Sequence, residues 1–294
     1  MLGASGIPMV NWGSKSVILG SVAAGPYANY GNALIERATL AVLGLASDTP
    51  RFSLFEPMTE TLARHINTFE LAVFTGCTIL DGRSGHQGFF NQHCSKIRIP
   101  KLLCAGAYCC EPGDKPSGEL AQWFDPPLAA RDPWTHKYLK SLGLDATLVG
   151  CPTLFEPFKH GDHENADRTL LSLTPRLNLS KEVFNSFGRV RMVRHQPGER
   201  QAEDARSPGL FDGVRMTVTG RLHLALPSIA RGIPVRFFGP DHWMDAKVRR
   251  AAGSTRFSLL DYLEVPQSGE VANHHPGEQI QHLREAFQHW TRAC

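Results

Sequence analysis

The chain has 294 residues, of which 42% are hydrophobic and 20% are charged, and this balance is typical of a folded protein without a disordered tract. A net charge of +3 is too small to argue for a nucleic-acid partner, which we therefore do not expect. The second half carries many separated basic residues: Arg189, Arg191, Arg194, Arg215, Arg221, Arg231, Arg236, Lys247, Arg249 and Arg250. Because no Lys/Arg block is continuous, this distribution favours a small anionic ligand over a long polyanion.

The seven cysteines show no paired metal-type spacing, and several lie in apolar runs such as residues 101–105. We therefore expect a reduced, cytoplasmic protein. The thirteen histidines lack matching cysteine or carboxylate spacing, so we expect no metal site. The first residues show no charged segment followed by a sustained apolar core, and the apolar stretches are too short to span a bilayer. Neither a secretory signal nor a transmembrane helix is expected.

Short apolar runs alternate with helical patterns in the first half, which is typical of parallel α/β architecture. Residues 33–43 predict a helix that follows the turn at 29–32 and ends at Gly44. Residues 71–74 predict a buried strand that runs into a turn at Thr75-Gly76-Cys77, and residues 101–105 predict another strand.

The segment 129–149 has the strongest local signals in the chain. A strand ends at Arg131, and Asp132 followed by Pro133 supplies an N-cap and a first-turn residue for a helix. One apolar face of this helix is formed by Trp134, Tyr138, Leu139 and Leu142. Gly143 closes the helix, and a strand follows at residues 146–149.

The chain turns polar between Pro152 and Lys181, and we place a domain boundary there, with domains at 1–158 and 159–294. The second domain is predicted to contain strands at 190–193, 214–218 and 234–238, a helix at 222–231 and a C-terminal amphipathic helix at 276–290. Pro227 falls inside the first of these helices and indicates a late start or a kink.

Gly220-Arg221-Leu222-His223 joins a strand to a helix and is the strongest candidate for chemistry. Free backbone N–H groups at a helix start favour an anion, and a guanidinium can grip phosphate or carboxylate through two bonds. His223 can act as an acid or a base near neutral pH. The alternative is that Arg221 forms a salt bridge and that His223 is a buried core residue.

Arg131 is the second candidate, because open α/β sheets bind ligands at the carboxyl ends of their strands. Its alternative is an ordinary surface ion pair with Asp125 or Asp132. His195, two residues after a strand, and Lys247, after the strand at 234–238, are further candidates for lining the cleft.

The turn Asn29-Tyr30-Gly31-Asn32 could hold an anion or a sugar hydroxyl. It could equally be a plain cap, in which Asn32 caps the N–H of Leu34 or Ile35.

For Lys247, named above, the alternative is an ordinary helix lysine that faces solvent.

Three segments together resemble the polysaccharide pyruvyl transferase family. Residues 218–235 are similar to the family's Gly-Arg-Leu-His turn, helix and Gly-x-Pro strand. Residues 130–144 resemble its Arg-Asp/Glu segment followed by Leu-Gly. Residues 29–35 resemble its N-terminal Asn-x-Gly-Asp segment, although Asn32 stands where the family usually has Asp. The three segments occur in the family's order.

The resemblance implies a glycosyltransferase-B-like (GT-B-like) α/β fold, with two Rossmann-like domains facing across a cleft. It also implies phosphoenolpyruvate as donor and a sugar diol as acceptor, without a separate cofactor. Arg221 and Arg131 would hold the donor's phosphate and carboxylate, and His223 would be the acid/base group. The acceptor would bind on the N-terminal side, near residues 86–93.

Other candidate substrate-binding residues are Gly220, Asn29, Gly31, Asn32, Gly76, His195 and Lys247. The turn Thr75-Gly76-Cys77 replaces a more glycine-rich one in the family. The resemblance therefore implies a transferase that forms a pyruvate ketal on a glycan or lipid-linked glycan precursor, with membrane contact only through such an acceptor at the inner face. The alternatives are a nucleotide-sugar glycosyltransferase of the same fold and a non-catalytic glycan-binding protein.

Overall fold

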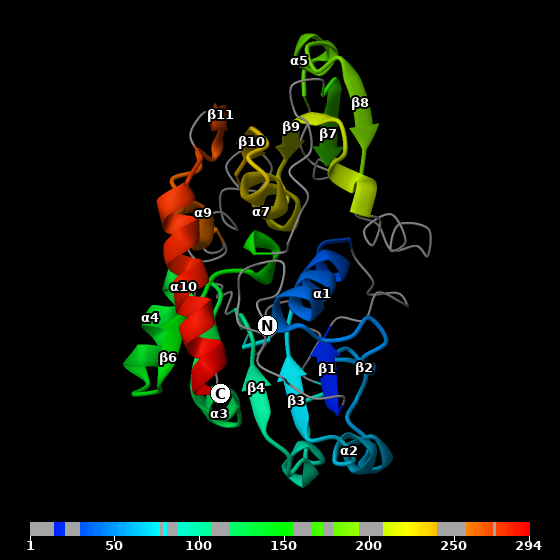
Figure 1. The fold of residues 1–294 in the computed structure, drawn as a ribbon, viewed down its shortest axis with the longest axis vertical. Helices are drawn as coiled ribbons and strands as arrows, with labels where there is room; N and C mark the ends of the chain where they lie inside the picture. The colour runs from blue at the N-terminus through cyan, green and yellow to red at the C-terminus, as the bar shows by residue number, and fades with distance from the viewer. Residues whose placement is uncertain are drawn as a thin grey trace.

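The computed structural model describes residues 15–20, 30–76, 79–80, 88–107, 118–155, 166–172, 179–193, 208–239, 257–272 and 275–294. Within these ranges the chain forms two α/β halves, each built on a mainly parallel sheet (Figure 1). None of the helices in these ranges is long and apolar enough to cross a membrane. The proposed domain boundary after residue 158 lies outside the described residues and stays a prediction.

The sheet of the first half is built from four short strands. Its strands are β1 (Ser16–Gly20), β2 (Arg51–Ser53), β3 (Leu71–Phe74) and β4 (Lys101–Leu103). They lie in the order β2-β1-β3-β4, and every pairing is parallel. A parallel pair of strands, β5 (Leu128–Ala130) and β6 (Ala146–Leu148), lies next to β4 and is joined to this region by isolated bridges. Burial on both faces explains why residues 17–19 of β1 and all of β3 are apolar.

Helices and 3₁₀ turns connect these strands: α1 (Tyr30–Leu43), α2 (Glu60–Ile66), η1 (Cys94–Lys96), α3 (Gly118–Gln122), α4 (Pro133–Ser141) and η2 (Pro152–Leu154). The predicted boundaries of α4 are confirmed. The Asp132 carboxylate accepts a 2.9 Å hydrogen bond from the Thr135 N–H, and Pro133 occupies the first turn. Gly143, just past the helix end, has a φ of 73°, a left-handed conformation that favours glycine.

The second half contains a five-stranded sheet in the order β11-β10-β9-β7-β8. Its strands are β7 (Arg168–Ser172), β8 (Arg189–Met192), β9 (Val214–Thr219), β10 (Val235–Phe238) and β11 (Ser268–Ala272). All pairings are parallel except that of β10 with β11. The helical elements of this half are α5 (Lys181–Asn185), η3 (Pro208–Phe211), α7 (Leu222–Ala230) and α9 (Ser258–Tyr262).

The C-terminal helix α10 (Gly277–Ala293) is amphipathic as predicted, with Ile280, Leu283, Phe287 and Trp290 buried. This helix was predicted to belong to the second domain, but its contacts reach the first half. The Trp290 indole N–H donates a 2.7 Å hydrogen bond to the Pro127 carbonyl, and the ring of Phe287 packs on Phe155. The helix therefore runs alongside both halves (Figure 1).

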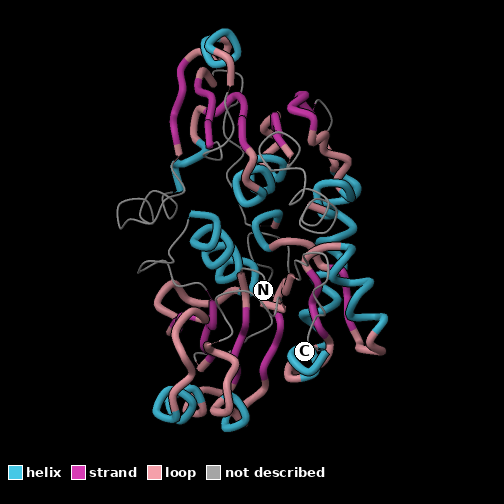
Figure 2. Tube along the Cα trace, turned by 180° about the vertical axis from the view of Figure 1, so that it is seen from behind, coloured by secondary structure: helices cyan, strands magenta, loops and turns pink. Residues whose placement is uncertain are grey.

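The strands of the two sheets point toward each other. In Figure 1 the arrows of β3 and of β7 and β8 converge on the middle of the molecule, where α1 and α7 lie. Figure 2 shows the same two halves from behind, one above the other. Two parallel α/β sheets whose carboxyl ends face each other form the GT-B-like arrangement, so the predicted fold class is confirmed.

Apolar packing joins the two halves through α1. Its residues Ala33 and Leu34 are buried in one cluster with Leu170 of β7, Leu224 of α7 and Ile233. A fully buried leucine side chain stabilises a fold by about 1.5–3 kcal/mol, and Leu34 is fully buried. Separating α1 from the second half would therefore cost substantial free energy.

Three of the features that differ from the sequence prediction lie close to the candidate site or lead into it. Helix α1 begins at Tyr30 rather than at residue 33, so Asn32 lies inside the first turn, and the prediction that it caps the helix is wrong. Strand β7 was missed because polar residues dominate the segment around it, although Leu170 and Leu171 are buried. Helix α7 runs from Leu222 despite Pro227, so the late start is wrong.

Candidate active site

A buried hydroxyl positions the turn between β9 and α7. The Thr219 hydroxyl donates a 2.8 Å hydrogen bond to the Ser172 carbonyl and accepts a 2.9 Å bond from the Arg221 N–H. Ser172 ends β7 and Thr219 ends β9, so the side chain ties together the carboxyl ends of two neighbouring strands. Neither Thr219 nor Ser172 was predicted as a site residue. A threonine directly before the Gly220 turn could have indicated this role.

Arg221 is the N-cap residue of α7, with extended backbone angles (φ −113°, ψ 118°). Its carbonyl accepts 3.1 Å hydrogen bonds from the N–H groups of Leu224 and Ala225. The Arg221 side chain is half-buried and does not cap the helix. Its positive charge therefore adds to that of the amino end of the helix dipole.

His223 is the second residue of helix α7 in the second half, yet it packs against the first half. A Cβ atom built on Gly31 of α1 would lie 2.7 Å from Nδ1 and 2.8 Å from Cβ of His223. The imidazole therefore lies directly on the backbone of α1. The structure thus brings together Gly31 and His223, two predicted site residues that are far apart in the sequence.

The end of β3 lies beside the same helix. Gly76 has a φ of 82°, and a Cβ atom there would be 4.0 Å from Ile35 of α1. The neighbouring Thr75 hydroxyl shares a 2.8 Å hydrogen bond with the Thr39 hydroxyl, also on α1. Asn32 is buried on α1 with 5% of its surface exposed. Helix α1 is therefore held at the carboxyl edge of the first sheet.

Arg131 follows β5 and is buried, with 5% of its side chain exposed. Its Nη2 lies 3.3 Å from Oδ2 of Asp132, whose side chain is fully buried. Its backbone N–H donates to the Gly106 carbonyl at 2.9 Å. The alternative partner Asp125 pairs with Lys101 instead. An ion pair with Asp132 does form, but in the interior rather than on the surface.

The second half also contacts this buried pair. The Ser258 hydroxyl of α9 donates a 3.1 Å hydrogen bond to Oδ1 of Asp132. The sequence offered no local signal for this contact, because Ser258 and Asp132 are far apart along the chain. Ser258 therefore reaches the Arg131 region only through the packing of the two halves.

The charge of Arg131 affects the pKa of the Cys151 thiol. Burial raises the pKa of Cys151, whereas a hydrogen bond from the Thr153 side chain and the positive charge of Arg131 lower it. Cys151 directly precedes η2, which contacts both α1 and α7. The segment η2 therefore lies where α1 and α7 meet.

Several predicted residues cannot be placed. Asn29, His195 and Lys247 lie outside the described residues, as do Cys77 and residues 81–87 of the expected acceptor side. Among the residues that are described, no three His, Cys, Asp or Glu side chains gather as a metal-binding group would require. The candidate site consists of Arg221, His223, Gly31 and Gly76, and Arg131 lies at the end of β5.

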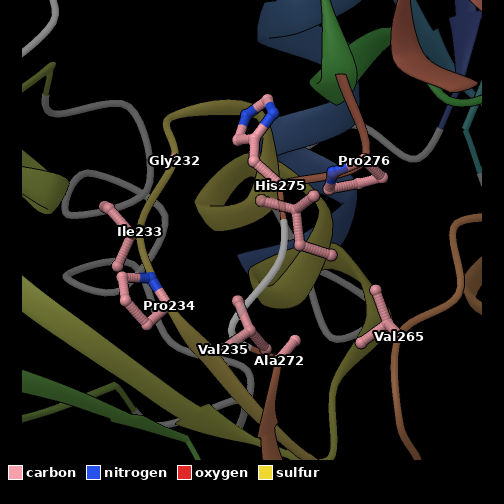
Figure 3. Close-up of a pocket in the computed structure, with 9 residues that line it drawn as sticks. Gly232, Ile233, Pro234, Val235, Val265, Ala272, His275 and Pro276 are labelled. Carbon is pink, nitrogen blue, oxygen red and sulfur yellow. The ribbon is translucent and has the colours of Figure 1, made fainter. Parts of the chain in front are cut away.

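A small cavity of about 160 Å³ lies elsewhere in the second half. Figure 3 shows its lining, which includes Ile233, Val235, Ala272 and His275. It adjoins the carboxyl end of α7 and the start of β10, whereas Arg221 and His223 lie at the amino end of α7. Among the residues that the structure describes, no predicted site residue lines this cavity.

No protein-family model and no curated protein matches this chain. Among solved structures it is similar to an uncharacterized protein of Klebsiella pneumoniae, with 13% identity and a TM-score of 0.51 over 87% of this chain and 92% of that one. It is also similar to the wall teichoic acid polymerase TagF (10% identity, TM-score 0.46, 99% of this chain and 87% of that one). A third similar structure is MnaA of S. aureus with UDP (9% identity, TM-score 0.44, 92% of this chain and 87% of that one). The similarity to the Klebsiella structure supports the two-sheet fold and gives no information on activity.

Proposed function

We propose that this chain is a pyruvyl transferase that uses phosphoenolpyruvate to form a pyruvate ketal on a sugar of a glycan or lipid-linked glycan precursor. The observation that supports this best is the contact between Gly31 and His223. It joins two of the three segments that resemble the pyruvyl transferase family, at the amino ends of α1 and α7. The third segment supplies Arg131 at the carboxyl end of β5.

In the proposed reaction, protonated His223 donates a proton to the methylene carbon of phosphoenolpyruvate, which leaves a cationic centre on the adjacent carbon. One sugar hydroxyl attacks that centre and gives up its proton to the imidazole. The bond between that carbon and the phosphate oxygen then breaks, and a second hydroxyl attacks the carbon, closes the ketal and gives its proton to the departing phosphate. The products are the ketal and inorganic phosphate, so atoms and charge balance without a redox step.

The two arginines would hold the two anionic groups of the donor. Arg221 is half-buried at the amino end of α7, where its charge and the helix dipole would stabilise the departing phosphate. Arg131 is largely balanced by Asp132, but its Nε makes no hydrogen bond with any residue that the structure describes. That N–H is a donor for the carboxylate of phosphoenolpyruvate.

The test is incubation with phosphoenolpyruvate and candidate glycans in D₂O, followed by mass detection of the product and measurement of phosphate. Because the transferred methylene gains one proton from solvent, we expect a ketal whose methyl group carries one deuterium, with one phosphate released per ketal. Absence of ketal with every acceptor, together with consumption of a nucleotide sugar, would replace this proposal with a glycosyltransferase of the same fold. Binding of glycans without any turnover would favour a non-catalytic protein.

A further inference from the structure

We propose that Gly31 is a positioning residue: by lacking a side chain, it lets α1 of the first half form the surface on which the His223 imidazole of the second half is oriented. The activity part of this proposal rests on the function proposed above, whereas the contact itself does not. Gly31 does not touch the reacting atoms in this proposal, and it acts only through His223.

The geometry leaves no room for a larger residue. A Cβ atom on Gly31 would lie 2.7 Å from Nδ1, 2.8 Å from Cβ and 3.1 Å from Cγ of His223. Approaches below 3.0 Å are essentially never seen for real Cβ atoms. Rotating the imidazole could relieve the contact with Nδ1, but the His223 Cβ is fixed to the backbone of α7. Any side chain at position 31 therefore has to push α1 and α7 apart.

The two helices are not free to separate. Leu34, one turn after Gly31, is fully buried in one apolar cluster with Leu224 of α7. Ile35 is buried in another cluster with Leu222 and Ala225 of α7. Moving α1 away would expose these side chains, so the packing of Leu34 and Ile35 on α7 holds the backbone of Gly31 against the imidazole.

Backbone conformation does not explain a glycine at this position. Gly31 lies inside α1, and its φ is not in the left-handed region. Alanine is the better helix former, so glycine here is locally unfavourable. The close approach of His223 is a physical reason for it.

The first test is a stability cycle with Gly31→Ala in three backgrounds: wild type, His223→Ala and His223→Gly. We expect Gly31→Ala to lower the urea midpoint clearly in the wild type and less in His223→Ala, where the 2.8 Å contact with Cβ remains. In His223→Gly both contacts are gone, so the substitution should be neutral or raise the midpoint. Equal midpoint shifts in all three backgrounds would overturn the proposal.

Gly277→Ala is the matched control. Gly277 also begins a helix beside an imidazole, but a Cβ atom there would lie 3.5 Å from Nδ1 of His275, an ordinary contact. We expect no loss of stability. If Gly31→Ala does not fold, the double variant Gly31→Ala/His223→Gly decides: recovery of folding supports the proposal, and an unfolded double variant contradicts it.

The second test measures pyruvyl transfer by Gly31→Ala. A displaced imidazole should lower kcat by about a hundredfold, while the KM for phosphoenolpyruvate changes less than about threefold. The pH dependence of kcat should shift, because the imidazole loses its native surroundings. A KM effect alone, with kcat and its pH dependence unchanged, would contradict the positioning role.

The two tests separate this inference from the proposed function. If the stability cycle shows coupling and no variant or wild-type protein forms a ketal, the proposed function fails and the contact stands. If wild-type protein transfers pyruvate and the cycle is additive, the positioning role fails and the function stands.

Discussion

The Arg131 and His223 regions both lie where a parallel strand ends, yet different forces hold the two side chains. Arg131 is buried against the carboxylate of Asp132, which is itself held by the Thr135 N–H and by Ser258. His223 is half-buried and lies against the bare backbone of Gly31. The first arrangement depends on charge and hydrogen bonding, and the second on steric fit between helices.

This difference predicts whether mutation in each region should lower mainly stability or mainly activity. A buried charge that loses its partner destabilises the whole fold. A half-buried imidazole that is removed leaves most packing intact but takes away a proton donor. The comparison therefore predicts that the Arg131 region is sensitive in stability and the His223 region in activity.

The largest effect should come from His223→Ala. We expect a loss of pyruvyl transfer of about 10²–10⁴-fold, which is the usual contribution of a general acid or base, with a change in unfolding free energy of about 1 kcal/mol or less. Ketal formation and urea denaturation measure the two quantities. Full activity in this variant would remove His223 from the mechanism.

Asp132→Asn should give the largest change in stability. Asparagine keeps the helix cap but leaves the Arg131 charge uncompensated, so we expect a loss of about 3 kcal/mol in unfolding free energy. The control is Asp125→Asn, since Asp125 is half-exposed beside Lys101 and should lose less than about 1 kcal/mol. Similar losses in both variants would show that burial does not distinguish the two pairs.

Arg221→Lys should act on donor binding. A lysine keeps the charge but cannot form two parallel hydrogen bonds with phosphate, so we expect the KM for phosphoenolpyruvate to rise about tenfold, equivalent to about 1.4 kcal/mol. Steady-state kinetics at varied donor concentration measure it. An unchanged KM would assign Arg221 a structural role.

Ser258→Ala should have the smallest effect, a loss of about 1 kcal/mol in unfolding free energy, because it removes one hydrogen bond to Asp132. Ser141→Ala on α4 is the control: its hydroxyl bonds the Tyr138 carbonyl at an exposed position, so its removal should be nearly neutral. If both variants are neutral, the link between α9 and Asp132 does not stabilise the fold.

Much of the local structure followed from sequence because it depends on neighbouring residues. Asp132 and Pro133 predicted the start of α4, Gly143 predicted its end, and the apolar spacing of α10 predicted its buried face. The start of α1 was placed too late, because the turn chemistry of Asn32 resembles that of a cap. In the structure this residue is buried within the first turn.

The α/β class, most strands and the residue types available for chemistry could therefore be predicted from the sequence. The contact of His223 with Gly31, the burial of Arg131 with Asp132 and the return of α10 to the first half became visible only in the folded chain. The physical reason is that hydrogen-bonded caps and apolar periodicity act over a few residues. Contacts between halves depend instead on how apolar faces far apart in the chain pack together.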